Sequence, residues 1–92
     1  MTRKRDRLQI IYDILHFLQG RKGKVRPTHI LYKSNLSHQM LTSYLTELTS
    51  NGFVIEQTDK KGKKLYEITK KGQNFLRDFH VIRSFIDSYG LE

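Results

Sequence analysis

The sequence predicts an α+β, mainly helical fold with three helices, a two-stranded hairpin and a long last helix. Apolar residues recur at helical spacing in separate segments, glycine-containing turns divide those segments, and two β-rich runs flank "DKKGK". The 92 residues suit one small core and show no internal repeat. We therefore expect one domain at residues 1–72, continuous with a C-terminal helix at 73–92.

The first helix is expected from about Arg5 to Gln19, because apolar side chains recur there every three or four residues. Gly20 and Gly23 follow it in a basic turn, and a short strand is expected at 24–26. The expected buried stripe consists of Leu8, Ile11, Leu15 and Leu18, widened by Ile10, Ile14 and Phe17.

A pair of helices follows this turn. Pro27 suits the first turn of the second helix, where its missing N–H is not needed, and that helix should stop near Asn35. Ser37 is a favourable N-cap for the third helix, and Gly52 can take the left-handed conformation that ends it. The expected buried face of the third helix consists of Leu41, Leu45 and Leu48.

The last third of the chain predicts a hairpin and a helix. The runs "FVIEQT" (53–58) and "KLYEI" (64–68) are rich in β-forming residues, and a turn containing Gly62 joins them. Thr69 is expected to cap the last helix, from about Lys70 to Tyr89. The order helix, helix, helix, hairpin, helix is typical of winged helix-turn-helix architecture.

Three segments carry a resemblance to a known family: "RLQIIYDIL", "ILYKSNLSHQMLTSYLTELTSNGFV" and "YEITKKGQNFL". Together they cover nearly the whole chain. They resemble an archaeal winged helix-turn-helix family that includes the ten-kilodalton DNA-binding proteins of Sulfolobus and many predicted transcriptional regulators. The resemblance implies binding to double-stranded DNA, and a homodimer joined through the C-terminal helices as an antiparallel coiled coil.

Charge is distributed unevenly along the chain. The formal net charge is +8, which favours an anionic partner such as nucleic acid or a membrane surface. Residues 1–33 hold nine basic and two acidic residues, and residues 59–71 hold six lysines and two acidic residues. Between them, residues 34–58 contain no Lys or Arg. Two positive blocks therefore flank a helix pair that lacks positive charge.

The exposed face of the third helix is polar but carries no Lys or Arg, which suits the reading of base edges. Hydrogen bonds and methyl contacts identify bases, whereas positive charge serves the phosphates. Without Arg, we expect weak or A·T-leaning specificity. A merely solvated polar face is the alternative. The predicted base-reading residues are Ser37, His38, Gln39, Thr42, Ser43 and Thr46.

Basic side chains in three places are predicted to contact the DNA backbone: the N-terminal arm, the second helix and the hairpin tip. Each phosphate that they neutralise would release counterions. A solvated lysine turn that protects an edge strand from aggregation is the alternative for the tip. The predicted backbone contacts are Arg3, Lys4, Arg5, Arg26, Thr28, Lys33, Lys60, Lys61, Lys63 and Lys64.

Apolar residues in the last helix follow a heptad-like spacing of 4, 3, 4 and 3. The segment from about Arg83 should project past the core, so its aromatic side chains would form an exposed apolar patch. We expect a homodimer contact there, and folding back onto the first helix is the alternative. The predicted dimer residues are Phe75, Phe79, Ile82, Phe85, Ile86 and Tyr89.

Other classes of function find little support. Cysteine is absent, and the four histidines lack metal-ligand spacing, so neither a metal site nor a cofactor is expected. Paired carboxylates, an activated nucleophile and a phosphate-binding glycine loop are missing, so we do not expect an enzyme. No segment is apolar enough to span a membrane, and a cytoplasmic, nucleoid-associated protein is expected.

Within DNA binding, a transcriptional regulator is slightly favoured over a low-specificity chromatin protein. The uncharged third helix permits direct reading of bases, while the charge elsewhere supports generic affinity. A winged-helix protein-interaction module is the rival from another class. RNA binding is less favoured, because no aromatic platform for unpaired bases is evident.

Overall fold

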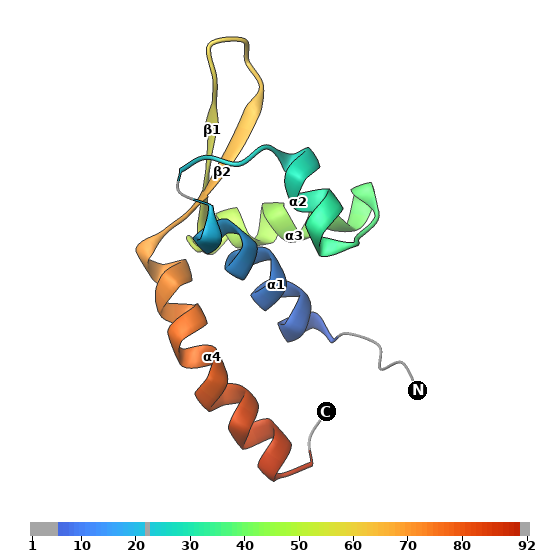
Figure 1. The fold of residues 1–92 in the computed structure, drawn as a ribbon, viewed down its shortest axis with the longest axis vertical. Helices are drawn as coiled ribbons and strands as arrows, with labels where there is room; N and C mark the ends of the chain where they lie inside the picture. The colour runs from blue at the N-terminus through green and yellow to red at the C-terminus, as the bar shows by residue number, and fades with distance from the viewer. Residues whose placement is uncertain (1–5, 22, 91–92) are drawn as a thin grey trace.

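Four helices and one antiparallel hairpin follow one another in the predicted order, which confirms the expected fold class (Figure 1). The computed structural model describes residues 6–21 and 23–90. The elements are α1 (Arg7–Gly20), α2 (Pro27–Ser34), α3 (His38–Ser50), β1 (Val54–Thr58), β2 (Lys64–Ile68) and α4 (Lys70–Ser88).

Side-chain caps fix the starts of three helices. The predicted caps Ser37 and Thr69 are confirmed, because each side-chain oxygen accepts a hydrogen bond from a backbone N–H in the first turn of its helix. Asp6 caps α1 in the same way and was not predicted. The expected start at Arg5 lies outside the described residues. Pro27 occupies the first turn of α2, as predicted.

The buried face of α1 differs from the prediction. Ile10 and Ile14 are buried with Leu15 and Leu18, whereas Leu8 and Ile11 are only half buried. Both sets recur at helical spacing, so periodicity could not choose between them. Packing decides, because α1 is covered by α2 and β2 and also by α4. The core side of the helix is therefore turned toward Ile10 and Ile14.

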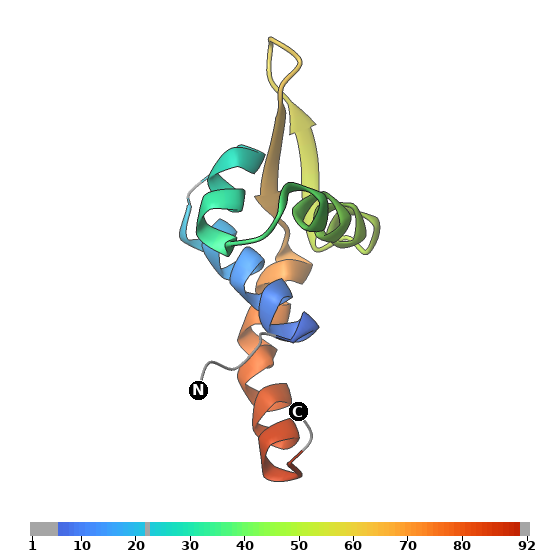
Figure 2. The ribbon, with the colours of Figure 1, turned by 90° about the vertical axis from the view of Figure 1, so that its right-hand side faces the viewer.

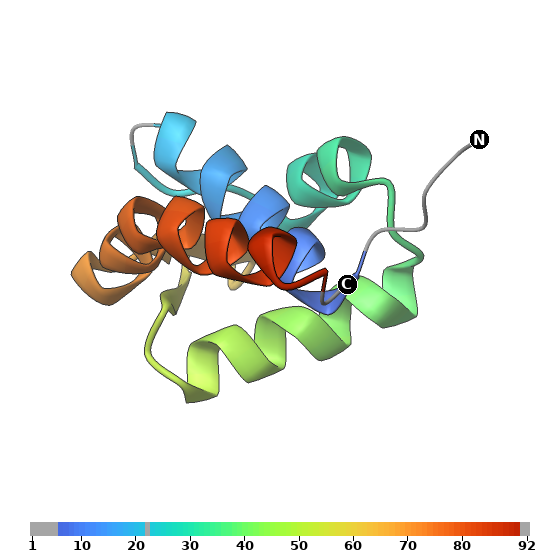
Figure 3. The same ribbon diagram turned by 90° about the horizontal axis from the view of Figure 1, so that it is seen from below.

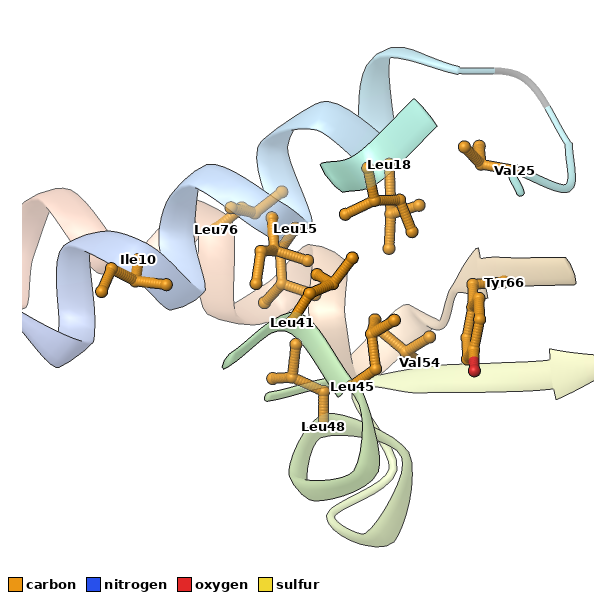
Figure 4. Packing of buried hydrophobic residues seen from close by; sticks show 12 residues of the cluster. Ile10, Leu15, Leu18, Val25, Leu41, Leu45, Leu48, Val54, Tyr66 and Leu76 are labelled. Atoms are coloured by element: carbon orange, nitrogen blue, oxygen red, sulfur yellow. The ribbon is translucent and has the colours of Figure 1, made fainter. Parts of the chain in front are cut away.

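The buried face of α3 is the predicted one, formed by Leu41, Leu45 and Leu48. Figure 4 shows Leu41 and Leu45 pointing from α3 toward the core side chains of α1, including Leu15. Each of these leucines contributes about 1.5–3 kcal/mol when it leaves water. Burial of this stripe fixes the rotation of α3 about its axis, and the opposite face is left in solvent.

The hairpin is anchored to the helices at its base and extends beyond them at its tip (Figures 1 and 2). Val25 and Tyr66 exchange two backbone hydrogen bonds, each of 2.8 Å. The short strand expected at 24–26 is thus a single bridge at Val25. Gly52 takes a φ of 79° and ends α3 as predicted.

The two halves of α4 have different surroundings. Leu76 and Phe79, in the first half, are buried, and Phe79 packs on Tyr12 of α1 with ring centroids 4.4 Å apart. Arg83 makes a bidentate ion pair with Asp6, at 3.0 and 3.2 Å. Beyond Arg83 the helix projects from the core, whereas α3 lies on another side of α1 (Figures 1 and 3).

Candidate nucleic-acid interface

The predicted base-reading residues occupy the exposed face of α3. His38, Gln39, Thr42, Ser43 and Thr46 are all exposed. Gln39 and Ser43 lie opposite the buried leucines, and the other three flank these leucines. Ser37 is also exposed, but its hydroxyl oxygen already accepts the backbone N–H of Met40 at 3.1 Å and caps the helix. The structure therefore brings the first five together and gives Ser37 a structural task.

Two threonines on this face have hydroxyl groups that donate within the helix. Thr42 donates to the backbone carbonyl of His38, and Thr46 donates to that of Thr42, each at 2.9 Å. Such bonds to the carbonyl four residues earlier are a known behaviour of Ser and Thr in helices. The single hydroxyl hydrogen of each threonine is thus in use.

A groove of about 640 Å³ lies between α3, the start of α2 and the hairpin. Its apolar lining includes Leu31, Leu41 and Leu45. Thr42 and Thr46 line it from α3. The hairpin contributes Glu56, Lys64 and Tyr66. The exposed face of α3 therefore adjoins the hairpin across a mainly apolar depression.

Glu56 places a carboxylate on the hairpin side of the groove. It accepts a hydrogen bond from the Tyr66 hydroxyl at 2.8 Å, and the Lys64 ammonium lies 3.7 Å from the same oxygen. Burial of the phenol, together with its bond to Glu56, raises the pKa of Tyr66 to about 12. Sequence reasoning missed this pair, because only the register of the hairpin places Glu56 opposite Tyr66.

The hairpin tip is organised by one acidic residue, Asp59. Its carboxylate accepts the backbone N–H groups of Lys61 and Lys63 at 2.8 and 2.9 Å. Gly62 completes the turn with a φ of 79°. The N–H groups of Lys63 and Lys61, with nearby Arg26, hold the pKa of the Asp59 carboxyl below its usual value. An Asp at the first position of a turn was a signal that could have revealed this role.

Arg26 contacts the hairpin. Its guanidinium pairs with the Asp59 carboxylate at 3.1 Å and so ties the start of α2 to the tip. Arg26 was predicted to contact phosphate, and this pair gives it a bracing role in the free protein. Thr28 and Lys33 are exposed on α2, and Thr28 also lines the groove.

The remaining predicted backbone contacts divide into two groups. Lys60, Lys61, Lys63 and Lys64 are exposed on the hairpin and lie close together around its turn. Arg3, Lys4 and Arg5 lie outside the described residues. Arg7 follows them and forms an ion pair with Glu47 of α3.

The predicted dimer residues fall into two sets. Phe79 is only 5% exposed and Phe75 is half buried, so both serve largely the core of their own chain. Ile82, Phe85 and Tyr89 are exposed, Phe85 and Tyr89 to 61% and 75%, and Ile86 is half buried. Among the predicted dimer residues, the exposed apolar surface therefore belongs to the second half of α4.

Metal binding and membrane insertion find no support in the described part of the chain. Across residues 6–21 and 23–90, His, Asp and Glu side chains nowhere gather in groups of three that could hold a metal ion. In those same residues, no helix combines the length and apolar character needed to cross a membrane.

The fold and the polar helix beside a lysine-rich hairpin define a winged helix-turn-helix protein. The chain belongs to the winged helix-turn-helix family, which it matches over residues 4–87. This match confirms the predicted family. The hairpin is therefore the wing of this fold.

Similar proteins come from archaea and bacteria. An uncharacterised protein of Methanocaldococcus jannaschii, MJ0287, is 29% identical over 85 residues, which cover 92% of this chain and 80% of that protein. The crystal structure of Sso10a-2, a DNA-binding protein from Sulfolobus solfataricus, is similar with a TM-score of 0.73 and 27% identity, covering 94% of this chain and 90% of that one.

A bacterial regulator shares the same architecture. The reduced form of the transcriptional regulator YodB from B. subtilis gives a TM-score of 0.66 with 28% identity, covering 83% of this chain and 76% of that one. These two solved structures are described as a DNA-binding protein and a transcriptional regulator, and neither is described as an enzyme.

Proposed function

We propose that this protein binds double-stranded DNA as a homodimer and regulates transcription. The single observation that carries the proposal is the exposed polar face of α3 beside a wing tip of four lysines. Sso10a-2, which is similar over most of its length, is described as a DNA-binding protein, and YodB is described as a transcriptional regulator. Both descriptions support this assignment.

In the proposed complex, α3 enters the major groove and the wing follows the backbone. His38, Gln39 and Ser43 supply polar groups on the exposed face. The lysines of the tip, with Thr28 and Lys33 of α2, meet phosphates that hold the protein in register. The N-terminal arm, which contains Arg3, Lys4 and Arg5, adds a general electrostatic contact.

The second half of α4 is proposed to join two copies of the chain. Phe85 and Tyr89 form an exposed apolar surface together with Ile82, and water-exposed patches of this kind mark interaction sites. A second copy is the favoured occupant, because the seam repeats at heptad spacing on a projecting helix. Two heads would then engage DNA at a spacing fixed by the dimer.

The DNA-binding part is tested by the affinity for a random-sequence duplex, measured by fluorescence anisotropy at increasing salt. We expect a log–log slope of roughly −5 or steeper, because several phosphates are neutralised. Negligible binding at low salt would contradict the proposal and favour a protein partner on the α3 face. A preferred site found by selection would favour a regulator, and uniform affinity would favour a chromatin protein.

Sedimentation equilibrium tests the dimer. Replacing two exposed side chains together, F85S and Y89S, should convert a dimer into a monomer without loss of helix content. The matched control is Y32S, because Tyr32 is 88% exposed but lies on α2. A dimer that survives the double substitution would contradict this contact.

A further inference from the structure

We infer that Thr42 and Thr46 recognise the 5-methyl group of pyrimidines, so that the protein senses thymine or 5-methylcytosine in the major groove. This inference rests on the proposed function and specifies how α3 reads DNA. It assigns to the two threonines an apolar contact in place of a donated hydrogen bond.

The hydroxyl groups of both threonines are already used within α3. A threonine side chain has one hydroxyl hydrogen and one methyl group. Both hydroxyl hydrogens are held by carbonyl groups of α3 itself, at 2.9 Å. Donation to a base would require breaking these bonds, whereas the methyl groups can make contact without any such cost. In the major groove, the apolar feature of a base pair is the C5 methyl of thymine.

The surroundings of the two threonines are mainly apolar. Both line the groove whose apolar lining includes Leu31, Leu41 and Leu45. On the hairpin side, the Glu56 carboxylate lies 3.7 Å from the Lys64 ammonium, so the pair presents no net positive charge that would draw a phosphate deep into the groove. The C5 methyl group of a base carries no charge and can leave water against this lining at little cost. The groove therefore suits the edge of a base better than the backbone of DNA.

The reading face of α3 has no Lys or Arg side chain. Residues 34–58 contain no Lys or Arg, so α3 cannot make the bidentate contact by which these residues commonly identify guanine. His38 and Gln39 remain as neighbouring hydrogen-bonding groups on the same face. Thr42 and Thr46 then contribute through their methyl groups, and toward a base each hydroxyl oxygen can only accept a hydrogen bond.

The test uses two duplexes that differ only in methyl groups. One is an alternating adenine–thymine duplex, and the other has deoxyuridine in place of every thymidine, which leaves base pairing and charge unchanged. By fluorescence anisotropy, we expect the thymine duplex to bind about fourfold more tightly for each methyl group that is buried. In a G·C-containing duplex, replacing cytosine by 5-methylcytosine should increase affinity in the same direction.

Two double variants separate the methyl from the hydroxyl. T42V/T46V keeps the methyl groups and removes the hydroxyls, so the preference for thymine should remain. T42S/T46S keeps hydroxyls that can bond to the same carbonyls but removes the methyl groups, so the preference should disappear while binding persists. Circular dichroism of both variants checks that α3 is still folded.

The outcomes are distinct. A thymine preference that survives in T42S/T46S would overturn the inference, because it would arise from the shape of the DNA and not from the threonines. Equal affinity of the wild-type protein for both duplexes would also overturn it and leave the proposed function intact. Failure to bind either duplex at low salt would overturn the proposed function and the inference together.

Discussion

The exposed face of α3 and the tip of the wing belong to the two elements on either side of one groove, but they differ in charge and in the interactions that hold them. The face of α3 carries hydroxyl, amide and imidazole groups and no Lys or Arg, whereas the tip carries four lysines. Phosphates respond to charge and base edges respond to shape and hydrogen bonding. Under the proposed function, generic affinity therefore belongs to the wing tip and sequence reading belongs to the neighbouring face of α3.

The two surfaces also depend on different interactions. The face of α3 is maintained within one helix, whose rotation is fixed by buried leucines and whose threonine hydroxyls bond to its own backbone. The wing tip depends on Asp59, which holds the turn, and on Arg26, which ties it to α2. The tip should therefore be the more easily disturbed of the two.

The largest expected effect comes from removing the charge of the tip. Replacing Lys60, Lys61, Lys63 and Lys64 by Gln should weaken binding to a random duplex by roughly 100-fold at low salt, because the tip no longer neutralises phosphates. The slope of log affinity against log salt should become shallower by about 0.9 for each phosphate that is no longer neutralised. Anisotropy titrations over a salt series measure both quantities.

A matched pair of variants controls for net charge. K60Q/K63Q removes two charges from the tip, and K70Q/R77Q removes two from exposed positions on α4. Only the first should weaken binding strongly if the tip is a contact surface. Equal decreases in affinity would mean that total charge alone governs binding and that the two surfaces are not specialised.

The next effect concerns the close contact between Gly72 of α4 and the residues at the base of the wing. Gly72 lies at the start of α4, where an added Cβ would approach the Phe53 carbonyl oxygen to 2.5 Å and the Ile68 side chain to 2.6 Å. G72A should therefore destabilise the fold by about 1–3 kcal/mol, since the carbonyl oxygen belongs to the backbone and the Ile68 side chain is packed against the core. Urea unfolding measures the change.

Gly20 provides the control for this substitution. It ends α1, and an added Cβ there would meet nothing within 4 Å. G20A should be neutral or slightly stabilising, because Ala is the better helix former. If the two alanine variants were equally stable, the close approach at Gly72 would not constrain the wing.

The fold could be predicted from sequence wherever local rules decide it. Ser37, Thr69 and Gly52 act through their own side chains or backbone, and the leucine spacing of α3 admits one buried face. The stripe of α1 could not be chosen, because two overlapping apolar sets fit the helical period. The packing of α2, β2 and α4 around α1 made Ile10 more buried than Leu8.

The sequence predicted which residues form the candidate site better than it predicted the contacts among them. The exposed residues of α3 followed once its buried face was known. The pair between Arg26 and Asp59 joins residues 33 positions apart, and no local pattern reveals such a contact. Phe79 was assigned to a dimer seam by spacing, yet its packing on Tyr12 depends on how α4 crosses α1. Long-range geometry accounts for each of these differences.

A smaller effect is expected from replacing Asp59, whose carboxylate holds the turn at the wing tip. D59A raises the net charge by one, which on charge alone should strengthen DNA binding. If Asp59 positions the lysines, the variant should bind about three- to tenfold more weakly, because the turn loses its two backbone hydrogen bonds and its tie to Arg26. D59N makes the same charge change but can still accept the turn bonds, so it should bind more tightly than D59A. Stronger binding by both variants would show that Asp59 acts only as an unfavourable charge.

The smallest effect at neutral pH concerns Tyr66, which lies on the hairpin side of the groove between the two surfaces. Its folded pKa is about 12, above the ordinary value of 10.0, because the phenol is buried and bonded to Glu56. The fold therefore favours the neutral phenol. The contribution of this phenol to the free energy of unfolding is complete below pH 10. It disappears as pH rises from 10 to about 12, because Tyr66 ionises first in the unfolded chain.

The difference between the wild-type protein and Y66F isolates the phenol from every other group in the chain. The free energy of unfolding, measured with urea at several pH values, should fall more steeply for the wild-type protein above pH 10. Below pH 10 the difference between the two proteins should stay constant. Parallel curves across the whole range would mean that Tyr66 ionises as easily in the folded protein as in the unfolded chain. The bond to Glu56 would then not favour the neutral phenol, and the hairpin would be held to the helices by the Val25 bridge and by the close approach at Gly72.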